Sequence, residues 1–372
     1  MTEEPPGPGP LDALTDVPGI RVGHAAVPGE LALSGTTVVL APEGGAVAAV
    51  DVRGGGPGTR ETDALDPRNL VQRIDAVVLT GGSAYGLDAA AGVMAWLEER
   101  GHGVRVGPDP SQVVPVVPAA CLFDLGRGGD WRARPDASTG RAAVEAAAAS
   151  GSGAPVPEGT VGAGTGAVAG QIKGGVGTAS VRLPSGTTVA ALAVVNAAGS
   201  VVDPRTGVLY GEYGAGESPA HPAPSVHEAA RRRLAGLAHR GGAAGNPADS
   251  GSAPGGGTHG APGNGVLNTT IAVVATDAVL TRAQAQKLAG TAHDGLARAV
   301  RPVHLLTDGD TVFALSTGRL PLPAEPVPAL NDILAAGADA LARAVVKAAR
   351  AARGADGPGG VFPSYSELYG TP

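Results

Sequence analysis

The chain has 372 residues, of which 43% are hydrophobic, and this is enough to bury one large core or two smaller ones. Its formal net charge of -7 and the lack of a basic run argue against binding to nucleic acid or to an anionic membrane surface. The single cysteine, Cys121, cannot form an internal disulfide, and no apolar run is long enough to cross a bilayer. We therefore expect a soluble, cytoplasmic protein.

Loops and linkers occupy part of this length, because 60 glycines and 32 prolines exceed average usage. Residues 1–10 are expected to be disordered, and residues 215–265 form a low-complexity linker with one helix near Val226–His239. A single domain of about 250–280 residues remains. The histidines in and beside the linker lack metal-ligand spacing, so we expect no metal and no cofactor.

The first predicted elements are strands. Residues 11–24 predict a turn and a short strand, and residues 36–41 and 46–52 predict two further strands joined in a hairpin. The loop that follows, residues 53–63, combines four glycines with a proline and several charges. Such a loop cannot be a packed element, so it is expected to approach another part of the molecule closely.

Residues 74–80 predict a buried strand that runs into a glycine turn and then a helix through Arg100. This layout can aim backbone N–H groups at a ligand, which makes Gly82, Ser83 and Tyr85 candidate substrate-binding residues. The alternative is a purely structural tight turn. The turn matches neither a nucleotide-binding fingerprint nor the G-x-S-x-G elbow of serine hydrolases.

Two polar residues stand out in the middle of the chain. Lys173 is the only lysine before residue 268 and is followed by two glycines, so it is either a solvated surface charge or a functional group. Residues 187–195 predict a strand buried on both faces that ends at Asn196. The Asn196 amide could donate to a developing oxyanion, or it could simply form a turn.

The segment Asn268–Asp277 ends a tract without periodicity and begins a short strand that is apolar on both faces. We hypothesise that the chain cuts itself between Asn268 and Thr269 and that Thr269 becomes an N-terminal nucleophile. A threonine hydroxyl needs a base, and a free α-amine with a pKa of about 7.7–8.0 supplies one. The alternative is that these residues merely start a strand.

The C-terminal part predicts further regular elements. Thr281 and Gln284 form a capping box that begins a helix, and residues 328–353 predict a last amphipathic helix. Residues 303–306 and 311–315 predict two strands joined across Asp308-Gly309-Asp310. These two carboxylates are either exposed turn residues or neighbours of the freed Thr269 amine.

Five segments together resemble one family: residues 15–24, 53–63, 79–87, 173–179 and 268–277. They resemble the DmpA-type self-processing aminopeptidases, which include L-aminopeptidase/D-esterases, β-peptidyl aminopeptidases and the nylon-oligomer hydrolase NylC. The resemblance covers nearly the whole chain outside residues 1–10, 215–265 and the C-terminal tail. It implies an α+β fold, an αββα sandwich of the N-terminal-nucleophile type, similar to that of ornithine acetyltransferases.

The same resemblance implies a cut between Asn268 and Thr269, with Thr269 as nucleophile. The products would be a large chain, residues 11–268, and a small chain, residues 269–372. By position, Asn196 matches an asparagine that binds the oxyanion, and Lys173 matches a lysine whose role is less defined.

Asp308 and Asp310 match a carboxylate pair of the NylC-like branch, whereas aminopeptidase members often have Gly-Ser at the cut and a Ser/Glu pair later. The chain is therefore closest to the NylC branch. The oxyanion-region tyrosine of the family has no clear equivalent here. Trp131 lies nearby, so it is added to the candidate substrate-binding residues.

We expect an amide hydrolase that acts on small amino-terminated peptides, amides or 6-aminohexanoate oligomers. The resemblance also implies a homotetramer of processed pairs. Two alternatives stay open at this point: an acyl transferase like ornithine acetyltransferase, and a non-catalytic assembly protein on the same scaffold.

Overall fold

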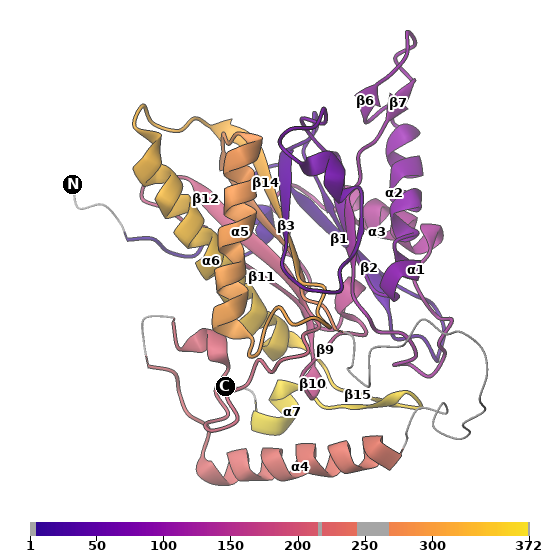
Figure 1. Ribbon diagram of the computed structural model, residues 1–372, viewed down its shortest axis with the longest axis vertical. Helices are drawn as coiled ribbons and strands as arrows, with labels where there is room; N and C mark the ends of the chain where they lie inside the picture. The colour runs from indigo at the N-terminus through magenta and orange to yellow at the C-terminus, as the bar shows by residue number, and fades with distance from the viewer. Residues whose placement is uncertain (1–4, 215–217, 244–267, 371–372) are drawn as a thin grey trace.

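The computed structural model describes residues 5–214, 218–243 and 268–370. Two five-stranded sheets lie face to face, and helices cover the outer face of each sheet (Figure 1). The result is four layers in the order helix, sheet, sheet, helix, which confirms the αββα sandwich.

Sheet I has the strand order β1-β2-β5-β8-β4. Its neighbouring strands are antiparallel except for the parallel pair of β5 and β8. Its strands are β1 (Arg21–Ala26), β2 (Gly35–Leu40), β4 (Gly58–Arg60), β5 (Ala76–Thr80) and β8 (Ala119–Cys121).

Sheet II has the strand order β11-β12-β13-β14-β3, so that β13 lies at its centre. Only β13 and β14 run parallel to each other. Its strands are β3 (Val47–Val52), β11 (Gly175–Arg182), β12 (Thr188–Val195), β13 (Ile271–Ala278) and β14 (Thr311–Leu320).

Two helices pack on sheet II, α5 (Arg282–Ala299) and α6 (Pro326–Ala351), and two on sheet I, α2 (Ala89–Glu98) and α3 (Ala137–Ala149). The predicted capping box of α5 is confirmed, because Thr281 and Gln284 each accept the backbone N–H of the other. The other elements are α1 (Ser83–Gly86), α4 (Pro224–Ala243), α7 (Tyr365–Tyr369), β6 (Val104–Arg105), β7 (Val113–Val114), β9 (Val168–Ala169), β10 (Ile172–Lys173), β15 (Ala355–Gly357), β16 (Gly360–Phe362), and the 3-10 turns η1 (Leu14–Asp16), η2 (Thr62–Leu65), η3 (Gly162–Gly164) and η4 (Tyr210–Glu212).

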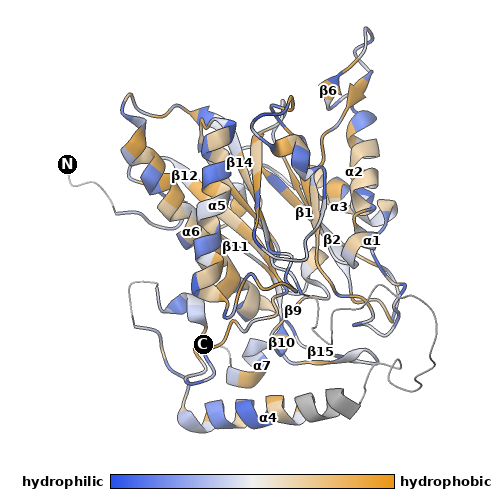
Figure 2. Ribbon diagram, viewed as in Figure 1, coloured by the Kyte–Doolittle hydropathy of each residue, from blue (hydrophilic) through white to orange (hydrophobic). Residues whose placement is uncertain are grey.

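The strands of sheet II are buried on both faces, as predicted. Every residue of β12 and β13 is buried. Leu192 and Val273 pack between the two sheets, whereas Ala193 and Val274 pack under α5 and α6. Figure 2 shows these apolar strands inside the sandwich. Each such leucine or valine side chain stabilises the fold by about 1.5–3 kcal/mol.

The predicted hairpin between residues 36–41 and 46–52 is wrong. Strand β2 pairs with β1 and β5 in sheet I, whereas β3 pairs with β14 in sheet II. Gly44 and Gly45, both with positive φ, turn the chain from one sheet to the other. Strands that are apolar on both faces can each enter the interior of a separate sheet, so adjacency in sequence does not make them partners.

The structure describes part of the expected disordered N-terminus, residues 1–10, and part of the expected linker, residues 215–265. Residues 1–4 lie outside the described residues, but Gly7 pairs with Arg182 and the Gly9 N–H donates to Ser180 Oγ at 3.0 Å. The described part of the segment for which disorder was expected therefore lies along β11. Helix α4 is the helix predicted within the linker, and residues 215–217 and 244–267 lie outside the described residues.

Candidate active site

Thr269 lies directly before the central strand β13 and is buried. Its N–H donates to the backbone oxygen of Asn196, at the end of the neighbouring strand β12, over 2.6 Å. Its hydroxyl donates to the carbonyl oxygen of Asn268 over 2.5 Å. The hydroxyl of the predicted nucleophile therefore contacts the carbonyl group of the peptide bond at which the cut was predicted.

A second donor reaches the same carbonyl. Asn268 forms a parallel bridge with Asp308, and the Gly309 N–H donates to the Asn268 oxygen over 3.2 Å. Only glycine fits here, because a Cβ at Gly309 would lie 2.8 Å from Thr269 Oγ1 and 2.9 Å from the Gly56 oxygen. Two donors on one carbonyl oxygen polarise the carbonyl group and can stabilise negative charge that develops on the oxygen.

Asp308 and Asp310 are buried, with only 1% of each residue exposed. The two Asp308 oxygens accept the N–H groups of Leu305, at 2.9 Å, and Ala198, at 3.3 Å, and Asp310 Oδ1 accepts the Thr270 N–H at 2.7 Å. Burial, together with the charge of Asp310, raises the pKa of Asp308. These are not the exposed acids of a hairpin turn.

Residues 303–306, which the structure describes, form no strand, so the first strand of that predicted hairpin is wrong. Its backbone instead folds around the two carboxylates. His304 adopts a left-handed conformation, with φ of 58°, and its N–H donates to Asp310 Oδ2 at 3.1 Å. His304 Nδ1 lies 2.7 Å from the same oxygen. We did not predict this contact from the sequence.

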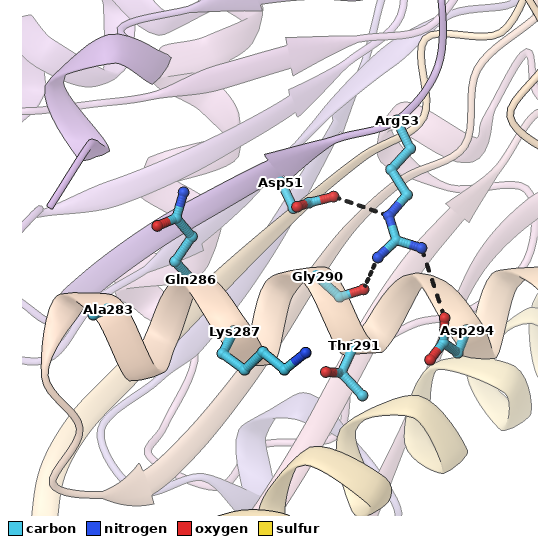
Figure 3. Close-up of a pocket in the computed structure, with 8 residues that line it drawn as sticks. All are labelled: Asp51, Arg53, Ala283, Gln286, Lys287, Gly290, Thr291 and Asp294. Carbon is cyan, nitrogen blue, oxygen red and sulfur yellow. Dashed lines mark hydrogen bonds and ion pairs between the residues drawn. The ribbon is translucent and has the colours of Figure 1, made fainter.

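The glycine-rich loop after β3 covers the carboxylate turn, as its close-approach composition predicted. The Gly56 N–H donates to the backbone oxygen of Asp308 over 2.7 Å, and the Arg53 N–H donates to the backbone oxygen of Asp310 over 3.0 Å. The Arg53 guanidinium in turn donates to the Gly290 oxygen of α5 and lies 3.6 Å from Asp294 (Figure 3). Helix α5 therefore anchors the loop that backs the site.

Asn196 is fully buried and its amide orientation is fixed by its neighbours. Its Oδ1 accepts the Val168 N–H at 3.0 Å and an N–H of Arg127. Its Nδ2 must therefore point the other way, and it donates to the Phe123 oxygen over a long 3.3 Å. The amide N–H₂ is thus the group that Asn196 can offer to another acceptor.

Arg127 is a site residue that the sequence reasoning missed. Besides Asn196, its guanidinium donates to Asn268 Oδ1 at 3.0 Å and to the Gly166 oxygen at 2.7 Å. Burial lowers the pKa of Arg127 to about 10, an effect that the charge of Asp124 partly offsets. Burial raises the pKa of Asp124 to about 6. Arg127 thus joins the residue before the predicted cut to the candidate oxyanion residue.

Lys173 is fully buried, which rules out a solvated surface charge. Its Nζ donates to the backbone oxygens of Gly164, Ala167 and Gly174, each over 2.9 Å. Burial lowers the pKa of Lys173 to about 7. Lys173 therefore holds the segment whose Val168 N–H fixes Asn196.

Three of the four predicted substrate-binding residues, Gly82, Ser83 and Trp131, contact residues 122–124, just before Arg127, and Tyr85 stacks on Arg134. The Gly82 N–H donates to Asp124 Oδ1 at 2.7 Å, and the Ser83 N–H donates to the Leu122 oxygen at 2.9 Å. Tyr85 is 57% exposed and Trp131 53% exposed. Among the hydrogen bonds of the described residues, none joins these four to Thr269, so substrate binding by them stays a prediction.

Neither a metal site nor a membrane span is found among the described residues. In those residues no group of three His, Cys, Asp or Glu side chains could hold a metal ion. Likewise, no helix within the described ranges is long and apolar enough to cross a membrane.

The four-layer architecture is that of a known class of hydrolases. The structure of an L-aminopeptidase D-Ala-esterase/amidase from Ochrobactrum anthropi, described as a new variant among the Ntn hydrolase fold, matches with a TM-score of 0.68. Sequence identity is 20%, and the match covers 97% of this chain and 93% of that one. The chain therefore has an N-terminal-nucleophile hydrolase fold.

Residues 12–362 match the model of Peptidase family S58, and the chain belongs to this family. An uncharacterized aminopeptidase of Mycobacterium tuberculosis is 47% identical over an alignment of 374 positions, which covers 96% of this chain and 98% of that protein. A 6-aminohexanoate-oligomer endohydrolase of a Kocuria species is 30% identical over 319 residues, 84% of this chain and 76% of that protein. The predicted resemblance is confirmed, and the chain is a hydrolase of peptide or amide bonds.

Proposed function

We propose that the chain cuts itself between Asn268 and Thr269 and that Thr269 then serves as the N-terminal nucleophile of an amide hydrolase. The observation that carries this proposal is the Thr269 hydroxyl, 2.5 Å from an Asn268 carbonyl oxygen that also accepts the Gly309 N–H. A hydroxyl held beside the preceding carbonyl is the arrangement that an intramolecular acyl shift needs.

Self-cleavage proceeds in two steps. Thr269 Oγ attacks the carbonyl carbon of Asn268, and the Gly309 N–H stabilises the charge that develops on the carbonyl oxygen. The carbon–nitrogen bond then breaks, and the leaving nitrogen takes the hydroxyl proton to become the Thr269 amine. Water hydrolyses the resulting ester, which gives an Asn268 carboxylate and a free Thr269 hydroxyl.

Turnover repeats this chemistry on a substrate amide. The new α-amine has an ordinary pKa of about 7.7–8.0 and accepts the hydroxyl proton as Oγ attacks. In the uncut chain the Thr269 nitrogen donates to the Asn196 oxygen, and the same contact would orient the amine. Water then releases the acyl group from Oγ.

The surrounding residues take supporting roles in this proposal. The amide N–H₂ of Asn196 donates to the oxyanion, since its Oδ1 is occupied by other donors. Asp308 and Asp310 supply negative charge beside the α-amine and a substrate ammonium group. Lys173, with a pKa of about 7, can hold or release a proton near neutral pH while it keeps Asn196 in place.

The substrate class follows from the relatives and the carboxylates together. The Mycobacterium tuberculosis relative is named an aminopeptidase, and the Kocuria relative acts on 6-aminohexanoate oligomers. The aminopeptidase name fits a substrate with a free amine a few bonds from the amide, whereas the name endohydrolase denotes cleavage within an oligomer. We infer that this chain acts on small amino-terminated peptides, amides or 6-aminohexanoate oligomers in the cytoplasm, as a tetramer of processed pairs. Acyl transfer is the less favoured alternative.

Intact-mass measurement of the purified protein tests self-cleavage. We expect two fragments in place of one chain of 36.1 kDa, with the smaller one beginning at Thr269. Thr269→Ala should remain a single chain without activity, whereas Thr269→Ser, which keeps a hydroxyl, should still be cut. An active wild-type protein whose only N-terminus is the original one would refute the proposal.

A panel of aminoacyl anilides and 6-aminohexanoate oligomers tests the substrate class. We expect hydrolysis of amides with a free amine and at least tenfold slower hydrolysis of their N-acetylated forms, because the acetylated nitrogen carries no charge for the carboxylates. An acyl product that appears on an added amine in preference to water would instead indicate a transferase. Size measurement of the processed protein tests the tetramer.

A further inference from the structure

The contacts of Asn268 describe a subsite for an acyl residue. The ester formed in self-cleavage joins the Asn268 carbonyl carbon to Thr269 Oγ. A substrate with asparagine on the acyl side of its amide would form the same ester, and the two differ only in what the asparagine nitrogen carries. The groups that hold Asn268 in the uncut chain are therefore available to the acyl residue of such a substrate.

Each polar group of Asn268 has a partner in this buried site. Its N–H donates to the Thr307 oxygen at 3.2 Å, and its backbone oxygen accepts the Gly309 N–H at 3.2 Å. Its Oδ1 accepts from Arg127 at 3.0 Å, and its Nδ2 donates to the Ala197 oxygen at 3.1 Å. The subsite thus offers one donor and one acceptor to the side chain, which together match a carboxamide.

Arg127 has contacts that do not depend on Asn268. One arm of its guanidinium donates to the Gly166 oxygen and to Asn196, and only the other arm donates to Asn268. A substrate oxygen that replaced Asn268 Oδ1 after the cut would meet this second arm already positioned. Binding to a donor held in this way costs little reorganisation.

We propose that the processed enzyme prefers amides whose acyl part is an N-terminal L-asparaginyl residue, with Arg127 as the residue that determines this preference. An apolar side chain such as leucine would leave an Arg127 N–H and the Ala197 oxygen buried without partners, which is costly. Aspartate would satisfy Arg127, but its second oxygen would face the Ala197 oxygen. The expected order is therefore asparagine, then aspartate, then alanine and leucine.

The first test uses the wild-type enzyme. We expect kcat/KM for L-asparagine p-nitroanilide to exceed that for the L-leucine and L-alanine p-nitroanilides by at least tenfold. This assignment rests on the proposed function, and the two can fail separately. A cut enzyme that hydrolyses alanine or leucine anilide as well as asparagine anilide overturns the preference alone. An uncut chain that hydrolyses none of them overturns the proposed function.

The second test removes the donor. Arg127→Met should lower the ratio of kcat/KM for asparagine anilide to that for alanine anilide by at least tenfold, and Arg127→Lys should lower it less. Arg105→Met is the matched control, because the exposed Arg105 guanidinium contacts only the Gly107 and Pro108 oxygens among the described residues. An unchanged ratio in Arg127→Met would contradict the assignment.

A third measurement does not depend on Arg127 variants folding. Since the subsite would hold residue 268 during self-cleavage, the rate of self-cleavage should fall in the order Asn268, Asn268→Asp, Asn268→Leu. Intact mass followed over time after synthesis measures these rates. Equal rates of self-cleavage for the three proteins would show that the subsite does not discriminate between acyl side chains.

Discussion

The free energy of unfolding should rise with pH between about 7 and 10.5 because of Lys173. Burial lowers the pKa of this lysine from 10.5 to about 7 in the folded protein. Between these values the unfolded chain binds more protons than the folded one, so stability increases with pH by about 1.36 kcal/mol per unit. Over the whole window the increase would reach about 4 kcal/mol, because the slope falls to half at each end.

The range from pH 7 to 9 isolates this effect, and it should yield about 2 kcal/mol. Other buried groups with strongly shifted pKa values titrate mainly outside it: His24, His293 and Asp124 below pH 7, and Cys121, Arg127 and Tyr365 above pH 9. Their contributions change little between these two pH values.

Urea unfolding at pH 7, 8 and 9, followed by circular dichroism, measures this slope. Thr269→Ala is the suitable background, since we expect it to remain one chain. Adding Lys173→Met should flatten the dependence, because the titrating group is gone. It should also lower stability at pH 9, because the neutral amine still has two N–H groups to donate to these backbone oxygens and methionine has none. A background protein whose stability is constant from pH 7 to 9 would refute the assigned pKa.

Two further substitutions test the surroundings of the site, and a third tests the segment of residues 66–71 that Arg282 of α5 holds. Gly309→Ala should block self-cleavage and cost about 1–3 kcal/mol of stability, because its Cβ would press on Thr269 Oγ1 and the Gly56 oxygen; complete cleavage on a denaturing gel would contradict this. Asp308→Asn should lower kcat/KM at least tenfold for an alanine anilide but less for the propionyl anilide, which lacks the amine. Equal losses for the two substrates would show that Asp308 does not bind the substrate ammonium group. Arg282→Met should lower the free energy of unfolding by about 1–3 kcal/mol and speed hydrogen exchange in residues 66–71, because its guanidinium donates to four backbone oxygens there; unchanged exchange would show that these bonds contribute nothing.

Local patterns predicted the existence of the central strands but not their partners. Continuous apolar runs identified β12 and β13, because burial on both faces leaves a direct trace in the sequence. The same property made β2 and β3 look like a hairpin. Pairing depends on long-range packing, so a short glycine turn between two apolar strands is compatible with two separate sheets.

The candidate site was predictable where its residues lie next to the ends of strands. Thr269 and Asn196 sit at the ends of neighbouring strands, so their proximity follows from the fold. Arg127 left no local signal, because glycines flank it as in an exposed loop and its partners Asn196 and Asn268 are 69 and 141 residues away. The contact of His304 with Asp310 depends on a left-handed backbone that no pattern specifies.

The central position of β13 in sheet II has a consequence for the two products of a cut before Thr269. The small product would carry β13 and β14, while the large product would carry β12 on one side of them and β3 on the other. Neither product could dissociate without breaking the hydrogen bonds between β12 and β13 and those between β14 and β3. The cut would therefore break the polypeptide chain but leave the two products associated in one folded protein. They should separate only when that protein is unfolded.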